Sequence, residues 1–443
     1  MAERFDLIVR NGHVLTSDGV TETDIGVAGG RSAALGSLKL AEAARVLDAT
    51  GLHVLPGVID TQVHFREPGM EHQEDIDTGT RGAVLGGVTS VFEMPNTIPS
   101  TIDRTAFDDK MRRAQGRAFC DYAVAVGGAE TNIDQLAALE HLPGCLGVNL
   151  FLGSSTAAKA LEGDEALIAI LAKTRRVVSA HCEDEARLKE RRHLVEGGAP
   201  VSAHADWRDA TAALMATRRF LAAARQTKRR VHVLNVTTAE EMPVLAANQD
   251  FATADATPLH LTFSAEDYAR LGSLIQTNPP IREARHRDAL WAAINAGVIG
   301  VVASDHSPHT RQEKAKPYPA SPSGAPGVQT LVPIMLDHVA KGRLSLARMV
   351  EITSTGPARI YGIEGKGRIA PGFDADLTIV DLAQRRIIED AWMACKVKWT
   401  PFVGMAVTGW PKATVVRGAV VMQDGEVLGA PAGRPIRFAV LRP

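Results

Sequence analysis

Residues 53–65, HVLPGVIDTQVHF, contain an apolar run that ends on polar side chains, and this pattern recurs through the middle of the chain. The runs are separated by Ala-, Leu- and Arg-rich segments such as 206–225, DWRDATAALMATRRFLAAAR, which are typical of helices. Strand–helix alternation repeated about seven or eight times predicts a parallel α/β sheet, either closed as a barrel or doubly wound. The other strand-like runs are TSVFEMP (89–95), FCDYAVAVG (119–127), CLGVNLFLG (145–153), RRVVSAHC (175–182), RRVHVLNVTT (229–238) and GVIGVVASDH (297–306).

Polar residues cluster where these runs end. His64, Asn96, His181 and Asp305 all stand at or just beyond the carboxyl end of a predicted strand. A (β/α)₈ barrel builds its active site from that end of its strands. We therefore predict an α/β protein with a (β/α)₈ TIM-type barrel over residues 56–360.

The two ends of the chain differ from the middle, because they consist of short strand-like runs separated by glycine. Two β-rich ends that flank a different middle predict one small β-sandwich domain, built from residues 1–55 and 361–443. Pairs of turn-forming residues predict hairpins within these ends. The predicted turns are Asn11-Gly12, Gly29-Gly30 and Asp424-Gly425.

Composition narrows the class of function. The chain has 443 residues, of which 45% are hydrophobic and 23% charged, as in a soluble globular enzyme. The formal net charge of -2 shows no excess of basic residues that would favour binding to nucleic acid or an anionic membrane. No apolar run is long enough for a membrane span or a secretory signal, so we expect a cytoplasmic protein. The 4 cysteines are far apart and lack CxxC spacing, which argues against a thiolate zinc site.

The polar residues at the strand ends indicate a chemical function only when they are considered together. Considered separately, His64 and His181 are most simply interpreted as polar residues that end a strand. Asp305 is followed closely by His306 and His309, which is harder to explain structurally. Two imidazoles and a carboxylate at the ends of buried strands suit a divalent metal with an open position for an activated water. Asp305 is also placed to take a proton from that water as a general base.

Five ordered motifs carry a family resemblance. They are DTQVHFREPG (60–69), EMPNT (93–97), HCED (181–184), SDHSPH (304–309) and GRIAPGFDADL (367–377). With these motifs in this order, the chain resembles the dihydroorotases of the amidohydrolase superfamily, whose close relatives are the allantoinases and hydantoinases. The resemblance runs from about Phe5 to about Gly425.

The resemblance implies a barrel with a β-sandwich, and reversible hydrolysis of dihydroorotate to N-carbamoyl-aspartate in pyrimidine biosynthesis. Family members use one or two zinc ions, and the aspartate that matches Asp305 serves as both metal ligand and proton shuttle. Residues matching Arg66, Asn96 and His309 hold the substrate carboxylate, and we add Asn278 to the predicted substrate-binding set. An arginine fork can donate two hydrogen bonds to one carboxylate, which favours dihydroorotate over hydantoins that lack it.

Three positions depart from the family's ligand pattern. Gln62 stands where the first motif usually has a histidine, although some relatives also carry glutamine there. Asn149, in the string VNLFLGSS, replaces a lysine that many relatives carbamylate to bridge two metals. Asn235 replaces a histidine, and His232 is predicted to face the opposite side of its strand. Amide side chains offer only neutral carbonyl oxygens, which are poor zinc ligands.

The surviving ligands His64, His181 and Asp305 predict at most one zinc ion per chain, held weakly.

Two classes of function stay open at this point. One is a dihydroorotase, or an allantoinase or hydantoinase relative. The other is a noncatalytic dihydroorotase-like subunit that scaffolds aspartate carbamoyltransferase. The retained pocket residues favour the enzyme, whereas Asn149 and Asn235 favour the scaffold. Related proteins are often dimers or tetramers, so we also expect a homo-oligomer.

Overall fold

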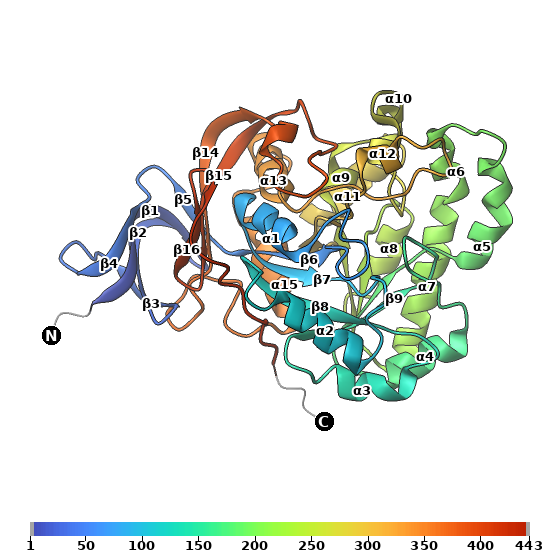
Figure 1. Ribbon diagram of the computed structural model, residues 1–443, viewed down its shortest axis with the longest axis horizontal. Coiled ribbons are helices and arrows are strands. Elements are labelled where there is room, and N and C mark those ends of the chain that lie inside the picture. Colours follow the sequence, from blue (N-terminus) through green and yellow to red (C-terminus); the bar gives the residue numbers. More distant parts are fainter. Residues whose placement is uncertain (1–3, 440–443) are drawn as a thin grey trace.

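The computed structural model describes residues 4–439, and its main body is a barrel flanked by a β-rich sheet (Figure 1). Eight parallel strands hydrogen-bond in chain order from β6 to β13. A parallel bridge between Val63 and His306 joins the first strand to the segment after the last, so the sheet closes. The predicted (β/α)₈ barrel is confirmed, and a doubly wound sheet is excluded. The strands are β6 (Val58–Val63), β7 (Val88–Glu93), β8 (Asp121–Gly127), β9 (Cys145–Phe151), β10 (Val178–His181), β11 (Val231–Leu234), β12 (Ala252–Ala256) and β13 (Val301–Val302).

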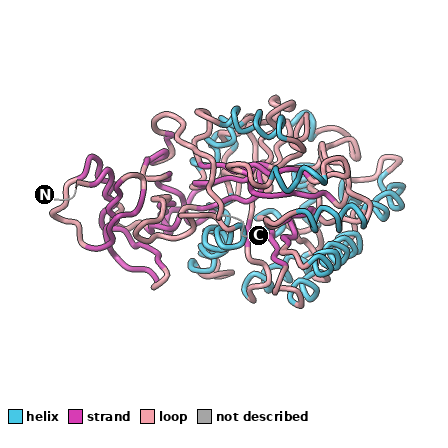
Figure 2. The backbone as a smooth tube through the Cα atoms, turned by 90° about the horizontal axis from the view of Figure 1, so that it is seen from below, coloured by secondary structure: helices cyan, strands magenta, loops and turns pink. Residues whose placement is uncertain are grey.

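Helices lie around the barrel, whereas the outer part of the β-rich sheet consists of strands and loops (Figure 2). The longest described helix, α7, begins after Asp209, whose side chain caps it by accepting a hydrogen bond from the Ala212 backbone N–H. The helices are α1 (Ile76–Leu85), α2 (Arg104–Ala114), α3 (Leu136–Leu139), α4 (Asp164–Lys173), α5 (Glu185–Glu190), α6 (His204–Trp207), α7 (Ala210–Thr227), α8 (Glu241–Ala246), α9 (Pro258–Thr262), α10 (Tyr268–Leu271), α11 (Ala284–Asn295), α12 (Arg311–Lys314), α13 (Leu331–Ala340), α14 (Leu346–Val350) and α15 (Gly356–Tyr361).

One barrel strand, β12, was missed by the sequence patterns. Its sequence, ATADA, has no branched apolar side chain, so hydrophobic periodicity does not detect it. In the barrel it pairs on both sides, with β11 and β13. Its Asp255 is fully buried and lies 3.0 Å from Nε2 of His232. His232 is thus held by its strand neighbour, away from the position that Asn235 occupies.

The two β-rich ends of the chain combine in one nine-stranded sheet, which confirms that they form a single β unit. β5 joins the halves, because it pairs with β1 from the N-terminal end and with β14 from the C-terminal end. Apolar side chains from both ends, such as Val9, Ile379 and Val415, pack in one buried cluster. The strands are β1 (Phe5–Thr16), β2 (Gly19–Ala28), β3 (Arg31–Gly36), β4 (Ala43–Asp48), β5 (His53–Pro56), β14 (Leu377–Ile387), β15 (Ala406–Val416), β16 (Ala419–Gln423) and β17 (Glu426–Val427).

The hairpin predicted at Asn11-Gly12 is wrong, because residues 5–16 form a single strand, β1. The strand bulges there, Asn11 adopts a φ of 59°, and its backbone N–H donates to Oδ1 of Asp24 over 2.9 Å. A Cβ on Gly12 would lie 2.6 Å from Cγ2 of Val54, so only glycine lets β1 approach β5 this closely. The turns predicted at Gly29-Gly30 and Asp424-Gly425 do join their strands, β2 to β3 and β16 to β17.

A buried group of charges ties the sheet to the barrel. Lys366 Nζ lies 2.7 Å from Oδ2 of Asp121, at the start of β8, and also pairs with Asp376, just before β14. Asp374 Oδ2 is 3.6 Å from the same ammonium, and Arg417 pairs with the other oxygen of Asp121. The Lys366 and aspartate side chains are buried, so the attraction is weakly screened by solvent. Barrel and sheet are therefore joined electrostatically as well as by packing.

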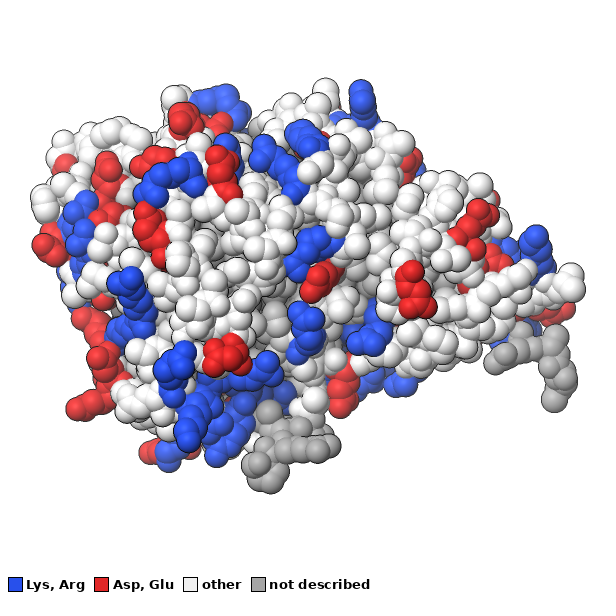
Figure 3. All heavy atoms as spheres, turned by 180° about the vertical axis from the view of Figure 1, so that it is seen from behind, with Lys and Arg blue, Asp and Glu red and all other residues white. Residues whose placement is uncertain are grey.

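The described surface carries both signs of charge. On the face seen in Figure 3, basic and acidic side chains are mixed, and basic ones gather beside the C-terminal end. None of the helices within residues 4–439 is long and apolar enough to span a membrane.

Candidate functional site

Six of the seven predicted site residues line one small cavity at the carboxyl ends of the barrel strands. They are His64, Arg66, Asn96, His181, Asn278 and Asp305. The seventh, His309, lies behind Arg66, with its Nε2 atom 3.4 Å from Nη2 of the guanidinium. The cavity volume is only about 20 Å³, and loop residues such as Thr156 and Ser323 narrow it. The closed barrel thus brings together side chains that are up to about 240 residues apart in the chain.

His64 and Asp305 form the centre of this cavity. Asn96 Nδ2 donates to the backbone carbonyl of Thr156 over 2.8 Å, so its Oδ1 atom is the one that faces His64 Nδ1, at 2.7 Å. An amide oxygen only accepts, so His64 Nδ1 carries a proton. In a neutral ring, His64 Nε2 then points a lone pair at Asp305 Oδ1, 3.2 Å away. Two lone-pair donors that converge in this way suit a cation between them, or else a protonated His64.

His181 is constrained by a buried ion pair. Its Nε2 atom lies 2.8 Å from Oε2 of Glu183, which in turn accepts from Nε of Arg208 over 3.0 Å. Burial alone would raise the pKa of Glu183, but Arg208 and His181 outweigh it and hold that pKa well below its ordinary value. Glu183 is therefore a carboxylate, and His181 Nε2 donates to it. Only Nδ1 of His181 is left for a metal or a substrate.

Each of the three residues that differ from the family's ligand pattern has a buried carbonyl oxygen that receives no hydrogen bond in the described part of the chain. These atoms are Oε1 of Gln62, Oδ1 of Asn149 and Oδ1 of Asn235. Asn235 Nδ2 donates to Asp305 Oδ2 over 3.2 Å, and Asn149 Nδ2 donates to Ser179 Oγ over 3.0 Å. Gln62 and Asn235 line the cavity, whereas Asn149 lies in β9 beside it. A buried acceptor without a donor is costly, so the centre favours a cation or a donor group.

The donor set can be tested against the metals of the family. Within residues 4–439, no group of three or more His, Cys, Asp or Glu side chains lies close enough to hold a metal ion. Two strong donors, His64 and Asp305, converge, and the side chains of Gln62 and Asn235 line the same cavity, with Nδ2 of Asn235 facing Asp305. Asn149 supplies no anionic bridge. The residues present therefore fit one cation with mixed donors, and they do not fit a bridged two-metal centre.

Arg66 is a buried cation without a carboxylate partner among the described residues. Its side chain is 1% exposed, Nε donates to the backbone carbonyl of Pro308 over 3.3 Å, and Nη1 has no hydrogen-bond partner. Burial lowers the pKa of Arg66 to about 10, which leaves the guanidinium charged at neutral pH. Its neighbour Glu67 pairs with Arg117 instead, at 2.6 Å. Carboxylates such as Glu93 and Asp305 act on Arg66 without direct contact, and a buried charge that lacks a direct partner is costly, so the arrangement favours an anionic ligand in this cavity.

Two other predicted substrate residues add no charge to the cavity. Asn278 Oδ1 accepts from Nε2 of His204 at 2.9 Å, and its Nδ2 atom donates to Ser155 Oγ at 3.2 Å. Burial lowers the pKa of His204 to about 3, so this ring orients Asn278 without adding charge. Burial and the nearby Arg66 also lower the pKa of His309 well below its usual value. The positive charge inside the cavity is thus concentrated on Arg66.

Sequence reasoning missed the loops that narrow the cavity. Thr156 accepts from Asn96 through its carbonyl, and its Oγ1 atom lies 3.4 Å from the carbonyl oxygen of Ser323. Ser323 belongs to the string SPSGAPG, whose Ser, Pro and Gly content marks a loop but carries no signal for a site. Glu183 lies within the HCED motif, and its proximity to His181 was the available signal for its orienting contact.

Comparisons with known proteins agree with this geometry. Residues 53–421 match the Amidohydrolase family. The chain is 33% identical to a dihydroorotase of Methanosarcina acetivorans over 440 residues, which cover 96% of this chain and 94% of the relative. It is 37% identical to a dihydroorotase of Halobacterium salinarum over 392 residues, covering 87% and 89% of the two chains.

Other relatives carry other names. An allantoinase of Deinococcus radiodurans is 31% identical over 448 residues, covering 98% of each chain. Among solved structures, an L-hydantoinase (dihydropyrimidinase) from Arthrobacter aurescens superposes with a TM-score of 0.94 at 31% identity, covering 98% of this chain and 100% of that one. Residues 53–421, which match the family, include all the barrel strands from β6 to β13, and the chain belongs to the Amidohydrolase family.

Proposed function

We propose that the chain is a dihydroorotase-type cyclic amidohydrolase of the cytoplasm, which interconverts dihydroorotate and N-carbamoyl-aspartate. The observation that carries the proposal is Arg66, a buried guanidinium without a carboxylate partner, in the same cavity as His64 and Asp305. Dihydroorotate bears a carboxylate beside its cyclic amide, so it can neutralise Arg66 while its ring faces Asp305. Allantoin and simple hydantoins lack that carboxylate and would leave the buried charge unpaired.

Each side chain has a distinct part in this proposal. Arg66 binds the substrate carboxylate, Asn96 and Asn278 line the pocket around the ring, and His309 contacts Arg66 from outside the cavity lining. Asp305 accepts the proton of the attacking water and returns it to the nitrogen that leaves the ring carbonyl. For the reverse reaction, the same carboxylate takes the proton from the ureido nitrogen that closes the ring.

We further propose that one divalent ion, zinc by family precedent, is bound by His64 and Asp305, with Nδ1 of His181 and the side chain of Gln62 in the same cavity. When bound, such an ion polarises the amide carbonyl and lowers the pKa of water. Neutral oxygens replace an anionic bridge and two imidazoles, so we expect weak binding and no second ion. Density or elemental analysis with two fully occupied metal sites per chain would contradict this.

A second candidate function rests on two of the residues that differ from the family's ligand pattern. Asn149 and Asn235 remove family ligands, which favours a noncatalytic subunit that scaffolds aspartate carbamoyltransferase. The two candidates are separated by measuring dihydroorotate ring opening and metal content on one purified sample. The enzyme opens the ring, and the Asp305→Asn variant does not. Absence of ring opening at saturating zinc, together with a stable complex with aspartate carbamoyltransferase, would overturn the catalytic proposal.

Restoring the two lost ligands should strengthen the site. We expect Asn149→Lys with Asn235→His to increase bound zinc and to raise the rate of ring opening about tenfold or more, equivalent to about 1.4 kcal/mol of barrier. Asn235 has a φ of 53°, a conformation that histidine tolerates better than most residues, so the backbone can accept the change. Elemental analysis and a ring-opening assay check the prediction.

The matched control replaces the same two residues without adding ligands, as Asn149→Met with Asn235→Gly, because glycine tolerates the positive φ at position 235. It should not increase zinc content or rate. A parent that is already fast, and that the restored ligands slow down, would show that the asparagines belong to a working one-metal site. The orientation of the new side chains also depends on surrounding contacts, such as that of position 149 with Ser179.

A further inference from the structure

The carboxylate of Asp305 has contacts at both of its oxygens. Oδ1 accepts a hydrogen bond from Ser307 Oγ over 3.0 Å and lies 3.2 Å from Nε2 of His64. Oδ2 accepts from Nδ2 of Asn235 over 3.2 Å. A carboxylate only accepts hydrogen bonds, so the amide of Asn235 presents its nitrogen and not its oxygen to Asp305. Asn235 thus holds the oxygen of Asp305 that His64 does not contact.

Both residues of this contact have an uncommon backbone conformation. Asn235 has a φ of 53° and Asp305 a φ of 47°, in the left-handed region that most residues other than glycine avoid. Such conformations persist only where surrounding contacts hold them. For Asp305, the backbone N–H of the preceding Ser304 donates to Oδ1 of Asp60 over 2.9 Å. The direction of the Asn235 side chain depends in the same way on what holds its own backbone.

Asp255, on the neighbouring strand β12, holds the backbone of Asn235. Its Oδ1 atom accepts from the Asn235 N–H over 2.6 Å, and its carbonyl oxygen accepts from the N–H of Val236 over 3.0 Å. The pairing of β11 with β12 ends just before, at Val233 and Ala254, so these two bonds continue it beyond the end of β11. A bond from a backbone N–H to a carboxylate is stronger than one to a neutral acceptor.

Asp255 is itself held in place by His232. Nε2 of His232 lies 3.0 Å from Oδ2 of Asp255, and Nδ1 lies 2.7 Å from Oγ1 of Thr253. Both side chains are fully buried, and both ring nitrogens and both carboxylate oxygens have partners. A continuous series of contacts therefore leads from Thr253 through His232, Asp255 and Asn235 to Asp305.

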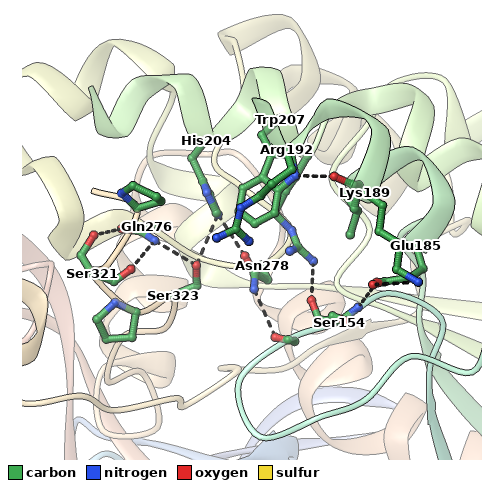
Figure 4. A pocket seen from close by; sticks show the side chains of 15 residues that line it. Ser154, Glu185, Lys189, Arg192, His204, Trp207, Gln276, Asn278, Ser321 and Ser323 are labelled. Carbon is green, nitrogen blue, oxygen red and sulfur yellow. Dashed lines mark hydrogen bonds and ion pairs between the residues drawn. The ribbon is translucent and has the colours of Figure 1, made fainter. Parts of the chain in front are cut away.

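Asp255 and His232 lie outside the cavities that a ligand can occupy. The inner cavity adjoins a larger outer one of about 490 Å³, with which it shares Asn278 and Ser323 (Figure 4). Neither Asp255 nor His232 belongs to the lining of the inner or the outer cavity. A substitution at Asp255 therefore leaves the residues around a ligand in place, and it acts on the reaction only through the residues that Asp255 holds.

We infer that Asp255 is a positioning residue for the proposed reaction, because it fixes Asn235 and, through the Asn235 amide, the direction of the Asp305 carboxylate. The inference rests on the proposed function and gives Asn235 a part in it, that of orienting the general base. Asp305 takes the proton of the attacking water, so its direction is set before the water reacts. Misplacement of a reacting group by about 1 Å can slow a reaction about a hundredfold.

Ring opening, measured at saturating dihydroorotate and zinc, tests the inference. Asp255→Leu keeps the approximate size of the side chain and removes the acceptor, and it should lower kcat about tenfold. Asp255→Asn keeps an acceptor oxygen and should recover most of that loss. Orotate affinity, measured by calorimetry, should change less than about twofold in either variant, because the ligand lies outside the contacts of Asp255.

A double-mutant cycle shows whether Asp255 acts through Asn235. Asn235→Gly removes the amide and tolerates the left-handed backbone. In the Asn235→Gly background, Asp255→Leu should cause no further loss of kcat, because residues that act through one contact have non-additive effects. Losses that multiply in the double variant would overturn the inference, and so would a parental kcat in Asp255→Leu. If leucine prevents folding, Asp255→Ser takes its place, since serine fits the site and is too short to reach Asn235.

Asp337→Leu is the matched control. Asp337 is also a buried aspartate that accepts from a backbone N–H, that of Thr408 over 3.1 Å, and it lies in α13, outside both cavities. Its substitution should lower stability and leave kcat unchanged. An equal loss of kcat in Asp337→Leu would assign the loss at Asp255 to general destabilisation and overturn the inference. That result would leave the proposed function standing, whereas a parent that opens no ring would overturn the proposed function and the inference with it.

Discussion

Replacing Arg66 by alanine should weaken orotate binding by about 2–5 kcal/mol, the usual effect of truncating one partner of a desolvated ionic contact. This corresponds to a loss of about 30-fold to a few thousandfold in affinity. The physical reason is that Arg66 is 1% exposed and has no protein carboxylate to pair with. The carboxylate of the ligand is its expected partner, because the cavity lining contains no other arginine and no lysine. Calorimetry with orotate measures the effect directly.

Two further variants separate a binding role from a structural one. Arg66→Met keeps most of the side-chain volume, and it should lose orotate binding while unfolding at the same or a higher urea concentration, because it removes an uncompensated buried charge. Arg113→Ala is a control outside the cavity, where it pairs with Asp109 and Glu67, and it should bind orotate like the parent. If Arg66→Met binds orotate normally but unfolds early, Arg66 serves the Pro308 loop instead of the ligand.

The second large effect concerns stability. Lys366→Met should lower the free energy of unfolding by about 3–5 kcal/mol, because removing one partner of a buried ion group leaves unpaired charges behind. Lys366 is in contact with Asp121 of the barrel, and with Asp374 and Asp376 at the start of the returning β segment. Arg417 remains beside Asp121 and Arg437 remains 3.2 Å from Asp374, so Asp376 is the carboxylate that loses its paired cation. The midpoint of urea unfolding, followed by circular dichroism, gives the measurement.

Lys412→Met is the matched control for that experiment. Lys412 also forms an ion pair in the sheet, with Asp424 at 2.6 Å, but both side chains are partly exposed to solvent. Such pairs contribute about 0–1 kcal/mol, so the control should unfold close to the parent. Equal midpoints for the two variants would show that the Lys366 group is well solvated and does not fasten the sheet to the barrel.

The difference between a motif and a working site is clearest at His181. Its place at the end of a strand is visible in the sequence, because apolar alternation predicts which side chains reach the barrel mouth. Which of its nitrogens is free is not visible, because that depends on Glu183 and on Arg208, 25 residues further on. A ligand position read from a motif therefore specifies the residue type and leaves its available atom undetermined.

Asn11-Gly12 shows the same limit for the fold. The pair is a strong local signal for a turn, yet the close approach of Val54 and the contact with Asp24 convert it into a bulge within one continuous strand. Similarly, β12 has no apolar pattern of its own and exists because β11 and β13 pair with it on both sides. Tertiary hydrogen bonding overrode local propensity in both places.

The sequence by itself determined the barrel, the β unit built from both ends and the residue types at the candidate site. These follow from short-range periodicity and from ordered motifs, which are properties of neighbouring residues. Only the tertiary structure decided that His64 faces Asp305 and that Arg66 lacks a carboxylate partner. Those facts depend on contacts between segments far apart in the chain. Burial there sets both the charge balance and the hydrogen-bond partners, which no local pattern encodes.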